Sequence, residues 1–261
     1  MLRFTNLSKA PFVKHIVTTR QGGVSLPPFD SLNLGLRVGD DPAKVAQNRA
    51  FTAQALKTNA IVYMNQVHSD RVVLIDYAPL EPPECDAMIS KTPNIALAVL
   101  TADCVPILFY DPKVRAIGVA HAGWKGSVAL IAIKTVEAMR ENFGSNPSDI
   151  LAAIAPAICA KRYEVGDAVI DEWRKLPDDF QPALSDRRLD LQLANRLQLR
   201  SIGVLDRNIE TMALCTYEND DFFSYRRANP TGRFASIIAI AARAFRDRRR
   251  YQKRQDRPKQ F

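Results

Sequence analysis

Cysteine is scarce in this chain and is not arranged for cross-linking. Four cysteines are spread over 261 residues, and no two of them form a Cys-x-x-Cys pair. A small disulfide-stapled domain and a zinc ribbon both need closely spaced cysteines, so neither class fits. We therefore interpret Cys85, Cys104, Cys159 and Cys215 as reduced thiols in a reducing compartment.

Long apolar runs are absent as well. The two longest, residues 95–109 and 234–245, are interrupted by Asp103 and Arg243. Both are shorter than the roughly 20 residues that a membrane-spanning helix needs. The opening segment MLRFTNLSKAPFVKH lacks the continuous apolar core of a secretory signal. We expect a cytoplasmic globular protein.

The positive charge is concentrated at one end of the chain. The formal net charge is +8, and residues 246–261 hold eight Lys or Arg and two Asp, a balance of +6 that leaves about +2 for the rest. This predicts one domain over residues 1–245 and a basic tail over 246–261. Two interpretations of the tail stay open: a solvated end, or weak, non-specific contact with nucleic acid or anionic surfaces.

Apolar periodicity predicts short strands mixed with helices. Asp41 followed by Pro42 is a typical helix start, and Gly144 is a typical helix end. The expected strands cover 12–18, 61–64, 71–76, 86–90, 95–100, 106–110, 115–120, 150–155, 203–206 and 221–225, and the expected helices 42–56, 127–144, 165–176 and 189–200. Pro106 places its strand at a sheet edge or at a strand start. The pattern predicts an α/β (mixed α+β) fold, with one domain built on a mixed sheet packed with helices.

Histidine is the scarcest of the metal-binding residue types, with only three in the chain. His68 precedes an expected strand, Cys104 lies between the expected strands 95–100 and 106–110, and His121 directly follows the expected strand 115–120. One thiolate and two imidazoles can bind zinc and leave its fourth position open, as in catalytic sites. No HExxH motif or deaminase signature supports the spacing, and a buried cysteine or histidine is often purely structural. His15, inside the first strand, is interpreted as structural.

Several segments together resemble one known family. These are TTRQGGVS, SLNLGLRVGDDPAKVAQNR, NQVHSD, LAVLTADCVPILFYDP, GVAHAGWKG, YEVG, LDLQLANRLQL and FFSYRR followed by TGR. In this order they are similar to the YfiH-like family, also called laccase-domain or polyphenol oxidase proteins. The resemblance runs from about residue 16 to residue 240 and excludes the basic tail. Lys125, where the family commonly has Arg, and the segment APAICAKRYEVG depart from the usual pattern.

The resemblance implies a fold, a metal site and an activity. The fold would be a YfiH-like α/β sandwich, and His68, Cys104 and His121 would bind zinc. The activity would be that of a purine nucleoside phosphorylase. Such an enzyme cleaves adenosine, inosine, guanosine or 5′-methylthioadenosine with phosphate, and it can also deaminate adenosine. The implied partners are therefore a purine nucleoside and phosphate, with no membrane.

Three other functions remain open at this stage. A single His₂Cys site can also hold copper, with Met64 or Met88 as an axial ligand. A multi-copper laccase does not fit, because only His15 remains for a second copper cluster. Cys104 and His121 can instead act as nucleophile and base in a metal-free thiol hydrolase, for example on cell-wall precursors. A module that binds RNA or a protein partner through the tail is the non-enzymatic alternative.

Phosphorolysis also needs cations for phosphate and groups that move protons. Asp103 is a candidate catalytic residue, either as general acid/base or as the hydrogen-bond acceptor of a metal-binding histidine. Lys125, in a glycine-containing turn before a helix, is a candidate for phosphate binding. Arg20, Arg226 and Arg227 are further candidates. The last two alternate faces if the strand at 221–225 continues, so at most one of them would reach the site.

Overall fold

The computed structural model describes residues 1–58 and 60–241 and contains two main β-sheets. The four-stranded sheet has the order β1-β12-β5-β2 and the six-stranded sheet the order β11-β8-β6-β7-β4-β3. The first sheet contains β1 (Val13–Val17), β2 (Ala60–Tyr63), β5 (Ile95–Thr101) and β12 (Phe234–Ile240). The second contains β3 (Val72–Leu74), β4 (Ala87–Ser90), β6 (Val105–Asp111), β7 (Ala116–Ala122), β8 (Leu151–Ile154) and β11 (Ile209–Thr211). Both sheets combine parallel and antiparallel pairs, which confirms the predicted mixed α/β fold.

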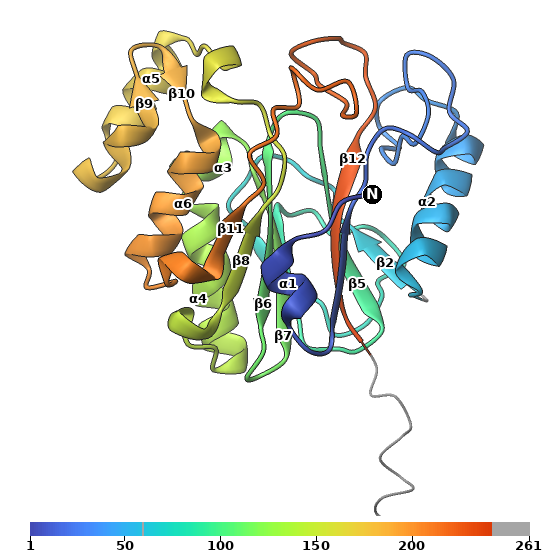
Figure 1. The fold of residues 1–261 in the computed structure, drawn as a ribbon, viewed down its shortest axis with the longest axis horizontal. Helices are drawn as coiled ribbons and strands as arrows, with labels where there is room; N and C mark the ends of the chain where they lie inside the picture. The colour runs from blue at the N-terminus through green and yellow to red at the C-terminus, as the bar shows by residue number, and fades with distance from the viewer. Residues whose placement is uncertain (59, 242–261) are drawn as a thin grey trace, which may run out of the picture.

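Helices cover the outer faces of the two sheets (Figure 1). The helices are α1 (Thr5–Lys9), α2 (Pro42–Leu56), α3 (Trp124–Val128), α4 (Ile131–Phe143), α5 (Asp167–Arg174) and α6 (Leu191–Ser201). Helix α2 lies on the four-stranded side, and α4 and α6 lie on the six-stranded side. A two-stranded ribbon of β9 (Leu184–Ser185) and β10 (Arg188–Leu189) sits near α5. None of the helices in the described ranges is long and apolar enough to cross a bilayer.

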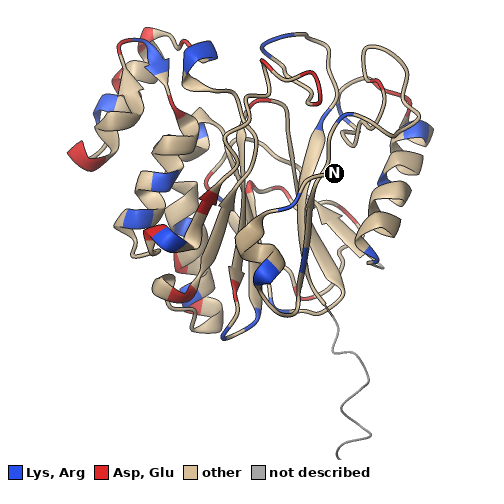
Figure 2. Cartoon of the chain, viewed as in Figure 1, with Lys and Arg blue, Asp and Glu red and all other residues tan. Residues whose placement is uncertain are grey.

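The side-chain alternation of the strands produces three apolar layers. In β5, Leu97 and Val99 belong to the core between the sheets, whereas Ala96 and Ala98 face the core beneath α2. In the six-stranded sheet, Leu108 faces inward in the same way. Successive side chains of a strand point to opposite faces, so a fully apolar strand can serve two cores. Figure 2 shows that Lys, Arg, Asp and Glu gather on helices and loops and largely spare the strands.

The expected helix over 127–144 is wrong at its start. The structure has two helices, α3 and α4, separated by Leu130, whose backbone is left-handed at φ 62°. The carbonyl of Ser127 accepts from Gln198 Nε2 of α6 at 2.8 Å, and in a continuous helix it would serve residue 131. Packing against α6 therefore divides the apolar stretch. The predicted end at Gly144 is confirmed, with a left-handed φ of 71°.

Two expected strands are absent. Residues 203–206 lead from a turn at Gly203 into the 3₁₀ helix Asp206–Asn208, and the strand in this region is β11, at 209–211. Residues 221–225 form turns, because Arg227 donates to the carbonyls of Thr216, Tyr217, Asn219 and Phe222 and so folds this segment on itself. Pro106 is the second residue of β6, an interior strand, so the strand-start interpretation is confirmed and the edge interpretation is wrong. The predicted tail lies outside the described residues.

Candidate metal centre and substrate cavity

Three residues far apart in the sequence converge at one end of the sandwich. His68 lies in the loop between β2 and β3, Cys104 in the turn between β5 and β6, and His121 near the end of β7. Their candidate ligand atoms all lie within 4.8 Å of one another. The two imidazole rings are 4.9 Å apart between centroids and meet edge to face at 71°. The antiparallel pairing of β6 and β7 brings Val105 opposite Ala122, which explains why Cys104 and His121 are neighbours.

A buried carboxylate orients both histidines. Asp86 is fully buried just before β4, and its Oδ1 lies 2.8 Å from His121 Nδ1. Its Oδ2 accepts from the backbone amide and hydroxyl of Ser69, at 2.6 and 2.8 Å, and from the amide of Val67. One side chain thus fixes the His121 ring and the loop that carries His68. The bond at Nδ1 leaves Nε2 of His121 as the atom available to a metal.

Asp86, and not Asp103, is the carboxylate that bonds a histidine of the cluster, which is one of the roles considered for Asp103. The Asp103 carboxylate does not reach a histidine: it accepts from Thr216 Oγ1 and from the amide of Arg226, each at 2.6 Å. Asp103 has a left-handed φ of 98°, and it ties the metal-centre turn to the segment around Arg226. The idea that Asp103 is the acceptor of a histidine is therefore wrong. The sequence signal for Asp86 was a lone carboxylate at the start of an apolar strand.

The electrostatics of the cluster favour a thiolate. Burial raises the pKa of Cys104, but the adjacent His121 and His68 outweigh it and lower that pKa to about 6. Burial lowers the pKa of His121, yet the charges of Cys104 and Asp86 and the hydrogen bonds with them raise it to about 9. A thiolate is the form of cysteine that binds metals, so Cys104 is ready as a ligand at neutral pH.

Gly123 gives this cluster its space. A Cβ atom at this position would lie 2.9 Å from Cys104 Sγ and 3.2 Å from the His68 ring. Only glycine lets the chain pass so close to both ligands. One sulfur and two nitrogen donors, with an open approach from the adjoining cavity, fit a tetrahedral metal that has three protein ligands.

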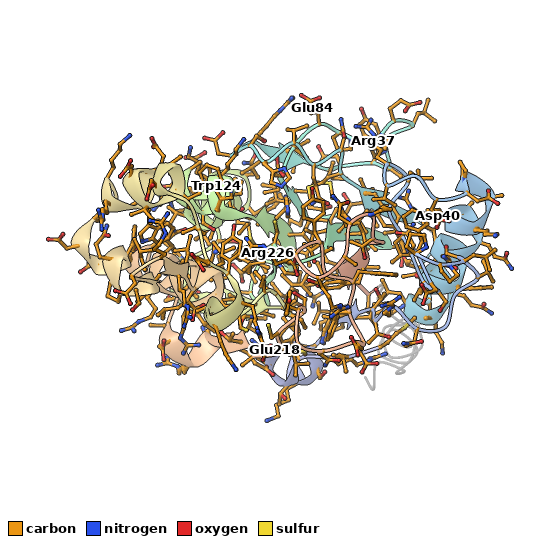
Figure 3. All side chains as sticks on the ribbon, turned by 90° about the horizontal axis from the view of Figure 1, so that it is seen from above. Arg37, Asp40, Glu84, Trp124, Glu218 and Arg226 are labelled. Atoms are coloured by element: carbon orange, nitrogen blue, oxygen red, sulfur yellow. The ribbon has the colours of Figure 1, made fainter. Side chains whose placement is uncertain are left out.

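A cavity of about 670 Å³ adjoins the three residues. This volume falls within the range of about 300–1,000 Å³ that is typical of small-molecule sites. Its wall contains four arginines and four large aromatic rings besides the three candidate ligands: Arg37, Arg49, Arg226 and Arg233, and Tyr63, Trp124, Tyr163 and Tyr225. Figure 3 looks onto this end of the molecule, with Arg226 near the middle and Trp124 and Arg37 on opposite sides of it.

Of the four side chains selected for phosphate, the structure brings only Arg226 to this cavity. Arg20 lies outside the lining and pairs with Asp30 at 2.8 Å. Arg227 is also outside, and its guanidinium is occupied by backbone carbonyls. Lys125 is exposed, with Nζ 5.7 Å from the ring centre of Trp124. Arg37, Arg49 and Arg233 are cavity residues that no sequence pattern singled out, although all three fall in segments that resemble the family.

The two methionines considered as axial copper ligands lie in different parts of the structure. Met64 lines the cavity, whereas Met88 is fully buried in the core between the sheets. His15 is 2% exposed, and its Nε2 accepts from the amide of Phe4 at 2.8 Å. It lies in a separate structural contact, and only two imidazoles meet at the candidate metal centre.

Comparison with known proteins places this geometry in a family. A family model described as multi-copper polyphenol oxidoreductase laccase matches residues 14–241. A protein of Deinococcus radiodurans named purine nucleoside phosphorylase is 43% identical over 248 residues, which cover 93% of this chain and 94% of that protein. One of the same name in Mycobacterium tuberculosis is 42% identical over 231 residues, covering 87% and 91%.

Solved structures agree with the sequence comparisons. The hypothetical protein YfiH of Bacillus licheniformis superposes with a TM-score of 0.84 at 40% identity, over 87% of this chain and 92% of that one. YlmD of Geobacillus stearothermophilus gives a TM-score of 0.84 at 35% identity, over 92% and 94%. The fold and the ordered sequence segments therefore have one explanation: this chain belongs to the YfiH family of laccase-like proteins.

Proposed function

We propose that this protein is a zinc-dependent purine nucleoside phosphorylase that splits adenosine, inosine, guanosine or 5′-methylthioadenosine with phosphate into the free base and the pentose 1-phosphate. The observation that carries the proposal is a three-ligand metal set in the wall of a cavity lined by arginines and aromatic rings. Relatives about 40% identical that bear this name support the choice of reaction.

The residues fit the requirements of phosphorolysis. Trp124, Tyr163 and Tyr225 offer aromatic surface to a purine. The arginines of the cavity offer hydrogen-bond donors and positive charge to phosphate. The glycosidic bond breaks through a state in which the sugar is positively charged and the base negatively charged. His68, Cys104 and His121 would hold zinc, which supplies a Lewis acid with an open position when bound.

Asp103 is proposed to contribute to the reaction by positioning Arg226 and Cys104. Its carboxylate holds the backbone of Arg226 while the next residue, Cys104, belongs to the metal set. It therefore connects the part of the cavity wall that carries Arg226 to the part that carries the three candidate metal ligands. We also propose adenosine deamination as a second activity of the same cavity, because both reactions act on a purine nucleoside beside an open metal position.

The test is incubation of the purified protein with adenosine, inosine and methylthioadenosine, each with and without phosphate. Free base that forms only when phosphate is present supports phosphorolysis. Inosine formed from adenosine supports the deaminase activity. Absence of both products, with zinc bound at one equivalent per chain, would exclude the proposed function.

The rival chemistries make different predictions. A multi-copper oxidase needs a second, imidazole-rich cluster, and the chain has three histidines, of which His15 is bound to Phe4. A metal-free thiol hydrolase is favoured by the lowered pKa of Cys104 beside His121. Metal analysis of protein purified without chelators separates the hydrolase from the proposed zinc enzyme. Activity without zinc that is lost on alkylation of Cys104 would support the hydrolase.

A further inference from the structure

The four arginines of the cavity have no carboxylate partners in the described chain. The ion pairs found within residues 1–58 and 60–241 involve other cations. Asp103 is the one carboxylate among the described residues that line the cavity, and both its oxygens already accept hydrogen bonds. The cavity therefore holds an excess of positive charge, four arginines against Asp103 and the Cys104 thiolate, in a molecule whose described body is nearly neutral.

Two of these arginines, Arg49 and Arg233, meet at one backbone segment. Arg49 of α2 donates through Nε and Nη2 to the carbonyl of Leu34, at 3.0 and 2.8 Å. The amide of Leu34 donates to the carbonyl of Arg233 at 3.0 Å. A Cβ atom on the next residue, Gly35, would lie 2.9 Å from Cγ of Arg233. Contacts with consecutive residues thus hold the two side chains at the same part of the wall.

The bonding of these side chains leaves donors free. Arg233 donates through Nη1 to the carbonyls of Thr231 and Gly232, at 3.0 and 2.9 Å. Its Nε and Nη2 have no acceptor among the described residues, and together they form the edge of the guanidinium that binds two oxygens of a phosphate. Arg49 keeps Nη1 in the same way. Burial lowers the pKa of both arginines, and the nearby Cys104 and Asp103 at Arg233, like Tyr63 at Arg49, oppose this shift without cancelling it.

Two hydroxyl groups lie at the same end of the four-stranded sheet. The Arg49 guanidinium stacks 3.8 Å above the ring centre of Tyr63, the last residue of β2. Thr101, the last residue of β5, pairs with Phe234, which follows Arg233 directly. Both residues line the cavity, are less than 10% exposed, and have hydroxyls without a hydrogen-bond partner in the described chain. Both hydroxyl oxygens are themselves buried, so they are unpaired polar groups beneath the wall that the arginines line.

We propose that Arg49 and Arg233 form an oxyanion subsite over the ends of β2 and β5, and that this subsite binds free inorganic phosphate. The naming of free phosphate rests on the proposed function, whereas the subsite itself rests on the geometry. The substrate would then lie between the metal centre, at the end of the six-stranded sheet, and the phosphate, at the end of the four-stranded sheet. Arg37 and Arg226 add positive charge along the same cavity.

Calorimetric titration of inorganic phosphate into the zinc-loaded full-length protein tests the proposal. We expect Arg233→Gln and Arg49→Gln each to weaken phosphate binding at least ten-fold, because each removes a charge-assisted donor. Arg233→Lys should restore only part of the affinity, since lysine cannot offer the two-pronged edge. Arg187→Gln, at an exposed arginine paired with Asp167, is the matched control and should bind phosphate like the wild type.

Gly35→Ala tests the same subsite without removing a charge. Its Cβ atom would displace Arg233, so phosphate affinity should fall although every arginine remains. This variant decides the matter if Arg233→Gln does not fold. Adenosine monophosphate, titrated in parallel, separates free from esterified phosphate: Arg233-dependent binding of the nucleotide alone would overturn the assignment to free phosphate.

Two outcomes distinguish this proposal from the proposed function. Arg233-dependent phosphate binding by a protein that splits no nucleoside would reject the phosphorylase and keep the subsite. Phosphorolysis in which the phosphate affinity is the same in the wild type, Arg233→Gln and Arg49→Gln would keep the function and overturn the subsite.

Discussion

At the scale of single residues, Asp86 connects the two candidate imidazole ligands. It binds the His121 ring directly and holds the amides of Val67 and Ser69 on either side of His68. A hydrogen bond of this kind fixes the ring orientation and raises the basicity of the ligand. Asp86 therefore supports the metal centre although it does not line the cavity.

Asp86→Asn is predicted to weaken zinc binding about 10- to 100-fold. The amide keeps the shape of the side chain but lacks the charge that supports the imidazole. Competition with a chromogenic chelator measures the affinity. Asp167→Asn, at an exposed carboxylate paired with Arg187, is the control and should bind zinc normally. Equal zinc affinity in Asp86→Asn and the wild type would show that the carboxylate does not support the metal site.

His15 makes the stability of the protein depend on pH. Burial, followed by the charge of Arg3, lowers its pKa from 6.5 to about 4. Between these two values the unfolded chain binds a proton that the folded chain does not, so folding stability is full above pH 6.5 and falls as the pH drops toward 4. From pH 7 to pH 5 we expect this group to remove about 2 kcal/mol.

Urea unfolding at pH 7 and pH 5 tests this prediction. His15→Gln can still accept the amide of Phe4 but does not titrate, so its loss of stability between the two pH values should be smaller by about 2 kcal/mol. The same loss in variant and wild type would mean that other groups cause the acid sensitivity.

At the scale of elements, the segment 216–227 forms one cavity wall without being a strand. The backbone carbonyls of this segment are bonded by the guanidinium of Arg227 and not by a neighbouring strand. Arg227 donates, for example, to the carbonyl of Thr216 at 2.8 Å and to that of Tyr217 at 3.0 Å. This folded loop then presents the amide of Arg226 to Asp103. A side chain that resembles a ligand-binding arginine in the sequence is thus a structural anchor.

Arg227→Lys is predicted to destabilise the fold by about 2 kcal/mol or more, because an ammonium cannot satisfy several separated carbonyls at once. The melting temperature and the rate of proteolysis within 216–227 are the measurements. Arg187→Lys, at an exposed arginine that pairs with Asp167 outside this segment, should leave both unchanged. Unchanged stability of Arg227→Lys would argue against the anchoring role.

At the scale of the whole molecule, the cavity draws on both sheets. Cys104 directly precedes β6, and His121 lies near the end of β7. Tyr63 and Thr101 are the last residues of β2 and β5, and Arg233 directly precedes β12. The apolar core between the sheets fixes the distance between these two groups. The candidate chemistry therefore depends on the packing of the sandwich and does not belong to a single loop.

Deletion of residues 246–261 is predicted to leave nucleoside turnover unchanged. These residues carry a balance of +6, and the resemblance to the family does not extend to them. The deletion should remove only salt-sensitive binding to polyanions, which can be measured by retention on heparin at increasing salt. A large loss of turnover would assign the tail a role at the cavity.

The sequence alone determined the mixed α/β class, most strand positions and the three candidate metal ligands, because local apolar patterns and short family-like segments are written in neighbouring residues. It failed for the strand at 221–225 and the continuous helix at 127–144, and three of the four phosphate candidates lie outside the lining of the cavity. Specific contacts of side chains with backbone carbonyls decided the first two, from the distant Gln198 to Ser127 in the helix and from the nearby Arg227 to residues 216–222 in the loop.

Only the tertiary structure identified Asp86, Arg49 and Arg233. Asp86 is 35 residues from His121, and Arg49 meets Arg233 through the segment at Leu34 and Gly35. No local pattern distinguishes a partly buried arginine without a carboxylate partner from one at the surface, since the difference depends on the residues that the fold packs around it. The chemistry of single side chains can be predicted from the sequence, whereas their partners are decided by which strands lie side by side.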